Sequence, residues 1–398
     1  MMTAKSSQQI YLDYAATTPL DPRVRERMLD CMDADIAFGN PSSSTHEYGA
    51  AAAAEIEKSA ADVAGVINAQ PDELVWTSGA TEANNLAVIG AAKFREQRGR
   101  HVVTSVTEHK SVLASCASLE AQGFEVSYLK PDAAGRIAKE TLAAAIRPDT
   151  VLVSLMHANN EIGVIQDIAA AGELCRTHDV LLHVDAAQTA GRVTVDVEAQ
   201  QIDLLSLNAH KACGPKGIGA LYMNSSRIRR VDPILFGGSQ QRGLRPGTLP
   251  THQIVGMGTA LALAHKEMLH EVPRIDALRK RLWSNIEHLP GVVLNGDTER
   301  SLCSILNVSV AAVEGESLRY ALQSLAVASG SACNSAIDEP SYVLRSLGRS
   351  DQLAEASIRF SLGRFTTTDE VDAAGKVFCE AVEYLQTISG ADVSAGLE

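Results

Sequence analysis

Short apolar runs and helical patterns alternate along the chain between residues 47 and 223, and this alternation is the strongest constraint on the fold. Strands separated by helices need crossover connections, which make the strands parallel in a sheet covered on both faces. We therefore expect an α/β fold with a mostly parallel central sheet. The predicted strands are 74–77, 101–106, 125–129, 151–157, 181–185, 203–207 and 218–223, and the predicted helices are 47–66, 82–97, 111–122 and 167–178.

The pattern changes after about residue 250, where longer helices and two strands predict a second, smaller α+β domain. The last helix begins with the capping-box sequence Thr367-x-x-Glu370. The other elements predicted here are helices 251–270 and 273–288 and strands near 304–310 and 357–362. We expect a large domain over residues 17–262 and a small domain formed by residues 1–16 and 263–398.

Net charge and composition exclude several function classes. The 398 residues carry a formal net charge of −13, which repels phosphate backbones and anionic membranes. We therefore expect no direct nucleic-acid partner and no membrane partner. The sequence has no apolar run of the ~20 residues that span a bilayer, and its start, MMTAKSSQQIYLDY, lacks a signal-peptide pattern. These features predict a cytoplasmic protein.

The seven cysteines are scattered, odd in number and without a C-x-x-C pair. This pattern favours a reducing compartment over a disulfide framework, and it predicts no metal site. Cys116, Cys175, Cys303 and Cys379 lie within apolar patterns, so we expect them to be small buried hydrophobes. Cys333 differs, because it lies in the polar, glycine-bearing stretch SGSACNSAIDEPS.

Polar residues follow several predicted strands, at the edge where ligands bind in sheets of this kind. Residues 79–81, Gly-Ala-Thr, start a helix whose free N–H groups suit a phosphate, although a simple tight turn has the same sequence. His109 starts the next helix, as either a reactive group or a helix cap. Asn160 follows a strand, where its amide also suits an Asx turn. Each signal alone therefore has an ordinary alternative.

Two further strand ends carry charge. Asp185 ends an apolar strand, where a buried carboxylate needs a cationic partner. Lys211 follows the next strand in NAHKACGPKGIG; taken alone, it is a solvated loop lysine. Together the five features fit pyridoxal phosphate, because a lysine binds its aldehyde, an acid faces its ring nitrogen and a helix start takes its phosphate.

Five longer stretches carry a family resemblance: HVDAAQ, NAHKACGPKGIGALY, RPGTLPTHQIVGMG, SGSACNSAIDEPSYVLRSLG and SIRFSLGRFTT. They resemble cysteine desulfurases of the class V aminotransferase superfamily, in the subgroup that serves iron–sulfur assembly and nitrogenase maturation. The similarity runs from Tyr11 to about Thr368. It implies a pyridoxal-phosphate-dependent transferase of fold type I, a homodimer that converts L-cysteine to L-alanine and passes the sulfur to an acceptor protein.

The resemblance also implies a role for each candidate residue. Lys211 binds the cofactor and moves protons at the substrate carbons, while His109 stacks on the cofactor ring. Cys333, in a loop of about residues 328–341, is the nucleophile that takes the sulfur as a persulfide. The remaining residues are Asn160 and Arg359 for the substrate carboxylate, Asp185 for the ring nitrogen, Gln188 for the phenolic oxygen, and Gly79, Ala80, Thr81, Asn208, His210 and, from the other subunit, Thr248 for the phosphate.

The sequence departs from the family pattern in two places. Serine or threonine usually stands where this chain has Asn208, and asparagine still donates a hydrogen bond. After the last helix, near Ile388, only SGADVSAGLE follows, without the longer extension by which housekeeping members dock an iron–sulfur scaffold. The acceptor therefore stays open among iron–sulfur scaffolds, with which Cys333 would transiently ligate a cluster, and carriers for tRNA thiolation or DNA phosphorothioation.

Two rival functions follow from the same residues. A selenocysteine lyase or a small-amino-acid aminotransferase belongs to the same superfamily, and an aminotransferase would not need Cys333. A non-catalytic partner-binding protein with this fold would have lost Lys211, Asp185 or Cys333, and the sequence keeps all three. The sequence therefore predicts an enzyme, a cysteine desulfurase.

Overall fold

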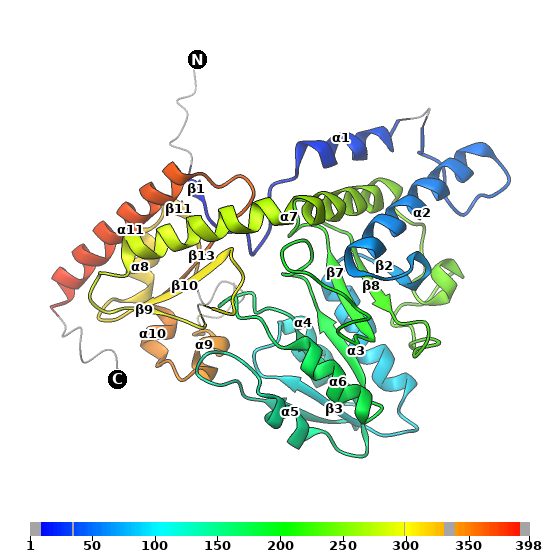
Figure 1. Ribbon diagram of the computed structural model, residues 1–398, viewed down its shortest axis with the longest axis horizontal. Coiled ribbons are helices and arrows are strands. Elements are labelled where there is room, and N and C mark those ends of the chain that lie inside the picture. Colours follow the sequence, from blue (N-terminus) through cyan, green and yellow to red (C-terminus); the bar gives the residue numbers. More distant parts are fainter. Residues whose placement is uncertain (1–8, 34–35, 298, 330–338, 391–398) are drawn as a thin grey trace.

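The computed structural model describes residues 9–33, 36–297, 299–329 and 339–390, and a seven-stranded sheet is its largest element (Figure 1). The strand order is β2-β8-β7-β6-β5-β3-β4. All neighbours from β4 to β7 are parallel, and β8 runs antiparallel to both β7 and β2, so the predicted mostly parallel sheet is confirmed. The strands are β2 Leu74–Thr77, β3 His101–Ser105, β4 Glu125–Leu129, β5 Thr150–Met156, β6 Leu181–Asp185, β7 Leu204–Asn208 and β8 Gly219–Met223.

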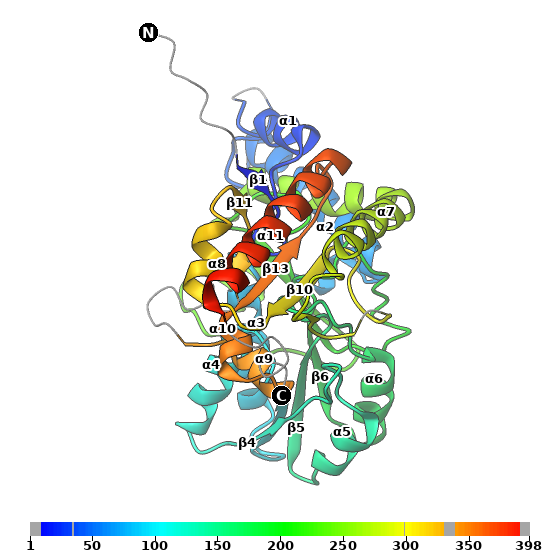
Figure 2. The same cartoon turned by 90° about the vertical axis from the view of Figure 1, so that its left-hand side faces the viewer.

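Helices cover both faces of this sheet (Figures 1 and 2). Alternate strand residues face opposite sides. Leu181 and Leu204 pack in a core with α3 and α4, whereas Leu182 and Leu205 pack in a core with α2, α6 and part of α7. The helices around the sheet are α2 Glu47–Ile67, α3 Ala80–Phe94, α4 Lys110–Glu120, α5 Lys139–Ala145, α6 Ile168–Thr177 and α7 Thr251–Ile286, with the 3-10 helices η1 Pro71–Glu73 and η2 Gln240–Gly243.

A second sheet of four antiparallel strands, β12-β13-β10-β9, forms another core with α11 and the second half of α7. Phe360 and Phe378 are fully buried there, with their rings 5.5 Å apart edge to face. The predicted capping box of α11 is present, from Thr367 to Glu370. The remaining elements are β1 Ile10–Tyr11, β9 Val292–Leu294, β10 Ile305–Val310, β11 Leu325–Ala326, β12 Ala328–Ser329, β13 Ser357–Ser361, α1 Pro22–Asp30, α8 Gly315–Ala321, α9 Tyr342–Ser346, α10 Asp351–Glu355 and α11 Thr368–Ser389.

The long helix α7 corrects one prediction. The sequence predicts two helices, 251–270 and 273–288, but the structure has a single helix of 36 residues with Pro273 inside it. A proline costs a helix one hydrogen bond and about 3 kcal/mol, and packing on both sides offsets this cost, since Ile254 lies in the sheet core and Ile275 in the second core. The helix thus crosses the predicted domain boundary at residue 262, and the division into two domains stays a prediction. Across the described ranges, no helix is long and apolar enough to cross a membrane.

His183 on β6 is within hydrogen-bonding distance of side chains on the neighbouring strands β5 and β7. Its burial leads us to expect that the protein is less stable in acid. His183 is fully buried, its Nδ1 lies 2.8 Å from Ser154 Oγ, and its Nε2 lies 3.0 Å from Ser206 Oγ. Burial lowers the pKa of His183 to about 4, so between pH 6.5 and 4 the unfolded chain binds a proton that the folded chain does not. Acidification from pH 7 to 5 should therefore lower the free energy of unfolding by about 2 kcal/mol through this residue.

Urea unfolding at pH 7 and pH 5 measures this contribution. His183→Gln should lose about 2 kcal/mol less than the parent protein on acidification. The exposed His178 provides the control, because His178→Gln should keep the parent's pH dependence. Equal pH dependence in His183→Gln and the parent protein would contradict the assignment.

Candidate active site

A cavity of about 610 Å³ lies where the carboxyl ends of β5, β6 and β7 meet the start of α3. This is the sheet edge at which ligands bind in α/β folds. Asp13, Thr17 and Lys216 line it besides the predicted residues. Of the predicted site residues it gathers Gly79, Ala80, Thr81, His109, Asn160, Asp185, Gln188, Asn208, His210, Lys211 and Arg359.

The start of α3 forms one wall of the cavity. Gly79 is the N-cap, and no side chain makes a capping hydrogen bond to the first turn. Free backbone N–H groups and the helix dipole at such a start attract an anion. The nearby Glu82 carboxylate accepts from the backbone N–H of Ser78 (2.7 Å) and from Arg245 Nε (2.8 Å), so an arginine offsets its charge. This wall therefore suits a phosphate.

Asp185, the last residue of β6, is a buried carboxylate that lines the cavity, only 5% exposed. Its Oδ2 accepts from Asn84 Nδ2 (2.7 Å) and its Oδ1 from the backbone N–H of Ala187 (2.9 Å). Within the described ranges, no lysine or arginine nitrogen lies within 4.0 Å of it. A buried charge without a counter-ion costs several kcal/mol, so Asp185 would stabilise a cationic group of a bound ligand.

His109 is a helix cap whose ring also lines the cavity. It is the N-cap of α4, where its Nδ1 accepts from the backbone N–H of Ser111 (3.2 Å), and its ring lines the cavity. Burial lowers the pKa of His109, so the imidazole is neutral at neutral pH. Asn84 links this cap to Asp185, because its Nδ2 also donates to Ser111 Oγ (2.9 Å).

Lys211 lies in the turn that follows β7. Its backbone N–H donates to Asn208 Oδ1 (3.3 Å), and its carbonyl oxygen accepts from Arg192 Nη2 (2.6 Å). Next to it, burial and then the charges of Lys211, Lys216 and Arg192 lower the pKa of His210 to about 4. His210 is therefore neutral at pH 7, and it lines the cavity together with Lys211.

Arg359, on β13, brings a guanidinium from the second sheet into the same cavity. It is 7% exposed, its Nη1 donates to the backbone oxygen of Asn160 (2.8 Å), and its Nη2 donates to Asp13 Oδ1 (2.7 Å). The guanidinium thus already binds one carboxylate, which is the chemistry expected for a substrate carboxylate.

Two predicted residues lie elsewhere. Thr248 is exposed, just before α7, and does not line the cavity of its own chain. Cys333 lies outside the described residues. The described ends of its segment adjoin the cavity: Ala328 pairs with Arg359, and Ser341 Oγ donates to Glu161 Oε2 (2.5 Å), next to Asn160.

Several site residues escape prediction from sequence. Asp13 and Thr17 stand in the YLDYAATTP stretch, where a polar cluster after a short strand is the available signal. Asn84 lies within an ordinary helix pattern and Arg192 follows a loop glycine, so neither carries a local signal. Their roles depend on contacts made across the fold.

The residues of the cavity fit pyridoxal phosphate. The lining includes an uncapped helix start, a buried carboxylate with no lysine or arginine nitrogen within 4.0 Å among the described residues, a neutral histidine and a lysine. These groups match the phosphate, ring nitrogen, ring face and aldehyde of that cofactor. Fold and site together define a pyridoxal-phosphate enzyme of the α/β class.

Comparison with known proteins places the chain in a family. Residues 10–374 match the family model described as aminotransferase class-V. Proteins named cysteine desulfurase IscS from Shewanella baltica (strain OS223) and Aeromonas hydrophila are each 54% identical over 380 residues, covering 96% of this chain and 94% of the relative. The chain therefore belongs to the class V aminotransferase family, among its pyridoxal-phosphate-dependent cysteine desulfurases.

Solved structures agree with this placement. A NifS-like protein superposes with a TM-score of 0.88 at 34% identity, covering 95% of this chain and all of the other. The structure described as SspA in complex with cysteine has a TM-score of 0.79 at 36% identity, with 90% and 99% covered. DndA from Streptomyces lividans has a TM-score of 0.75 at 40% identity, with 88% and 99% covered.

Proposed function

We propose that the protein is a cysteine desulfurase that converts L-cysteine to L-alanine and transfers the sulfur first to Cys333 and then to an acceptor protein. One observation carries the proposal: Lys211 and Arg359, from two different sheets, face one cavity, and Arg359 pairs with the strand that leads to Cys333. Relatives that are 54% identical carry the name cysteine desulfurase, and a structural neighbour is described in complex with cysteine.

The cavity residues hold the cofactor in this proposal. When bound, pyridoxal phosphate supplies an electron sink for charge that develops at the substrate carbons. Lys211 would bind its aldehyde carbon and move protons at the substrate carbons, Asp185 would hold the proton on the ring nitrogen, and neutral His109 would lie against the ring. The phosphate and ring oxygen are held by Gly79, Ala80, Thr81, Asn208, His210 and Gln188 of one chain and Thr248 of the partner.

Arg359 and Asn160 orient the substrate. The guanidinium takes the carboxylate of L-cysteine in a two-pronged contact, in competition with Asp13, which accepts from its Nη2 in this structure. The backbone oxygen of Asn160 accepts from Arg359 Nη1 at 2.8 Å and so fixes the plane of the guanidinium. Binding of the substrate carboxylate thus depends on the Arg359 guanidinium.

Cys333 takes the sulfur. Its thiolate attacks the substrate sulfur, an S–S bond forms, the C–S bond breaks with its electron pair on carbon, and a proton completes alanine. Thiolate reactivity needs an accessible group of low pKa. The six other cysteines are buried or half-buried, and burial raises the pKa of each thiol, to about 12 for Cys116 and Cys175.

A homodimer completes the site. Thr248 is exposed on its own chain and contributes to the cavity of the partner in this proposal. The described surface also exposes large apolar side chains on α1, on α2 and in the loops that precede α2 and η2. They include Leu29 (57%), Phe38 (56%), Tyr48 (57%) and Phe236 (86%), a set that a second copy would cover.

We further propose a protein as the sulfur acceptor, in the cytoplasm. The net charge of −13 disfavours direct contact with nucleic acid, so thiolation of tRNA or DNA would pass through a carrier. The six described cysteines are free thiols, in keeping with a reducing compartment.

A single turnover with L-cysteine tests the function. The protein loaded with pyridoxal phosphate is mixed with L-cysteine, alanine is assayed, and the added sulfur is located by mass spectrometry. We expect alanine, with one added sulfur on Cys333. Cys333→Ala should form no persulfide, whereas Cys379→Ala, which removes a half-buried thiol on α11, should behave like the parent protein.

Other products would assign another function. Pyruvate formed while the cofactor gains an amine would indicate an aminotransferase. Efficient cleavage of L-selenocysteine with no turnover of L-cysteine would indicate a selenocysteine lyase. Sulfur found on another cysteine would refute the role of Cys333.

A further inference from the structure

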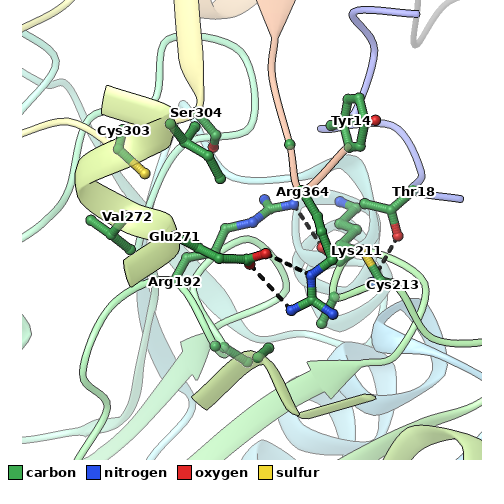
Figure 3. Close-up of a pocket in the computed structure, with 16 residues that line it drawn as sticks. Tyr14, Thr18, Arg192, Lys211, Cys213, Glu271, Val272, Cys303, Ser304 and Arg364 are labelled. Atoms are coloured by element: carbon green, nitrogen blue, oxygen red, sulfur yellow. Dashed lines mark hydrogen bonds and ion pairs between the residues drawn. The ribbon is translucent and has the colours of Figure 1, made fainter. Parts of the chain in front are cut away.

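Arg192 lies beneath the cavity and contacts two residues that line it. Its Nη2 donates to the backbone oxygen of Lys211 at 2.6 Å, and its Nη1 donates to Oε1 of Gln188 at 3.2 Å. Figure 3 shows the guanidinium beside Lys211. The preceding Gly191 has φ +75°, and a Cβ there would lie 2.5 Å from Ala264 Cβ on α7, so the turn that presents Arg192 requires glycine.

A second guanidinium near the same place is paired differently (Figure 3). Arg364 binds three carboxylates, those of Asp21 (2.6 Å), Glu271 (2.7 Å) and Glu267 (3.1 Å). In the part of the chain that the structure describes, no carboxylate oxygen lies within 4.0 Å of Arg192. Partial burial of a cation without an ion pair costs free energy, so Arg192 is poorly explained as a stabilising residue alone.

The contact between Arg192 and Gln188 fixes the direction of an amide. Arginine has only donors, so the amide atom that faces it is the oxygen. The NH₂ group of Gln188 therefore points the other way, where Nε2 donates to the backbone oxygen of Ala15 at 2.9 Å, and Ala15 lines the cavity. If the Gln188 amide were reversed, its NH₂ group would face the N–H groups of Arg192, and two donors would oppose each other.

We propose that Arg192 is a positioning residue that holds the Gln188 amide with its N–H donor toward the cofactor's ring oxygen and anchors the backbone of Lys211. The proposal rests on the proposed cofactor site and adds the residue that orients the Gln188 amide within it. A donor at the ring oxygen stabilises the anionic form of that oxygen. The nitrogen that joins Lys211 to the cofactor then loses its proton at lower pH.

A pH titration of the cofactor's visible absorption band tests this, with loaded protein and no substrate. Arg192→Met keeps the side-chain length and removes the donors, and it should move the titration midpoint up by about one pH unit. Gln188→Ala should give a similar shift, and the double variant should move no further, because Arg192 acts through Gln188. Arg192→Lys, which keeps the positive charge and a single donor nitrogen, should recover part of the shift.

Arg274→Met is the matched control, since Arg274 also donates to backbone oxygens, those of Thr366 (2.9 Å) and Arg364 (2.8 Å), away from the cavity. Its midpoint should equal that of the parent protein. An unchanged midpoint in Arg192→Met, or full addition of its shift to that of Gln188→Ala, would overturn the proposal. If Arg192→Met does not fold, Arg192→Leu, which also lacks a donor, gives the same comparison. A parent protein without a visible band would instead refute the cofactor site.

Discussion

Lys211→Ala should abolish turnover of L-cysteine while leaving the fold intact. We expect a loss of roughly four orders of magnitude or more, because one amine both binds the cofactor covalently and moves the protons. The backbone of Lys211 is held by Asn208 and Arg192, so truncation of its side chain leaves the turn in place. Activity with L-cysteine and the visible absorption band of the bound cofactor are the two measurements.

Lys216 provides the control for charge. It lines the same cavity, so Lys216→Ala removes the same positive charge from it. Lys216→Ala should keep the pH-sensitive visible band, whereas Lys211→Ala should show only the spectrum of the free aldehyde. Retention of the lysine-bound spectrum in Lys211→Ala would rule out Lys211 as the binding residue.

Asp185→Asn should bind the cofactor and lose most of the rate. The amide is nearly the same size as the carboxylate, but it carries no charge to hold the proton on the ring nitrogen. We expect turnover to fall roughly 10²–10³-fold, the usual effect of removing one preorganised electrostatic partner. Single-turnover rates of alanine formation measure the effect.

Asn84→Ala is the control that separates the charge of Asp185 from the structure around it. Asn84 Nδ2 donates to Asp185 Oδ2 at 2.7 Å and to Ser111 Oγ at 2.9 Å, so Asn84→Ala removes a support and keeps the charge. We expect Asn84→Ala to be impaired much less than Asp185→Asn. Equal loss in both variants would mean that Asp185 acts through local structure and not through its charge.

The sheet is largely predictable from sequence because its strands other than the edge strand β4 are buried on both faces. Strands 74–77, 125–129 and 181–185 match β2, β4 and β6 residue for residue. Each is a short apolar or β-branched run bounded by turn residues, a signal that depends only on local sequence. The helix α7 was mispredicted for the same reason, because Pro273 is a local stop signal and the packing that overrides it comes from two separate cores.

The residues of the candidate site also fall into two groups, those that could be predicted from sequence and those that could not. Residues at strand ends, such as Asp185 and Lys211, could be predicted because sheet topology brings strand ends together. Asp13 and Arg192 could not, since each acts through a partner that is distant in sequence: Asp13 accepts from Arg359, 346 positions away, and Arg192 donates to Lys211, 19 positions away. Contacts of this kind exist only after folding.

Helix α7 belongs to both cores, and this constrains how the two parts of such a protein can evolve. The first half of α7 packs with the sheet that carries Lys211, and its second half packs with the sheet that carries Arg359. Neither half of the gene therefore encodes a self-sufficient module. Recombination that exchanged one half for that of a distant homologue would have to preserve the length of this helix. Each residue inserted would rotate the second half of the helix, and the core packed on it, by about 100° relative to the first half. We therefore expect the cofactor-binding part and the substrate-binding part of such enzymes to descend together.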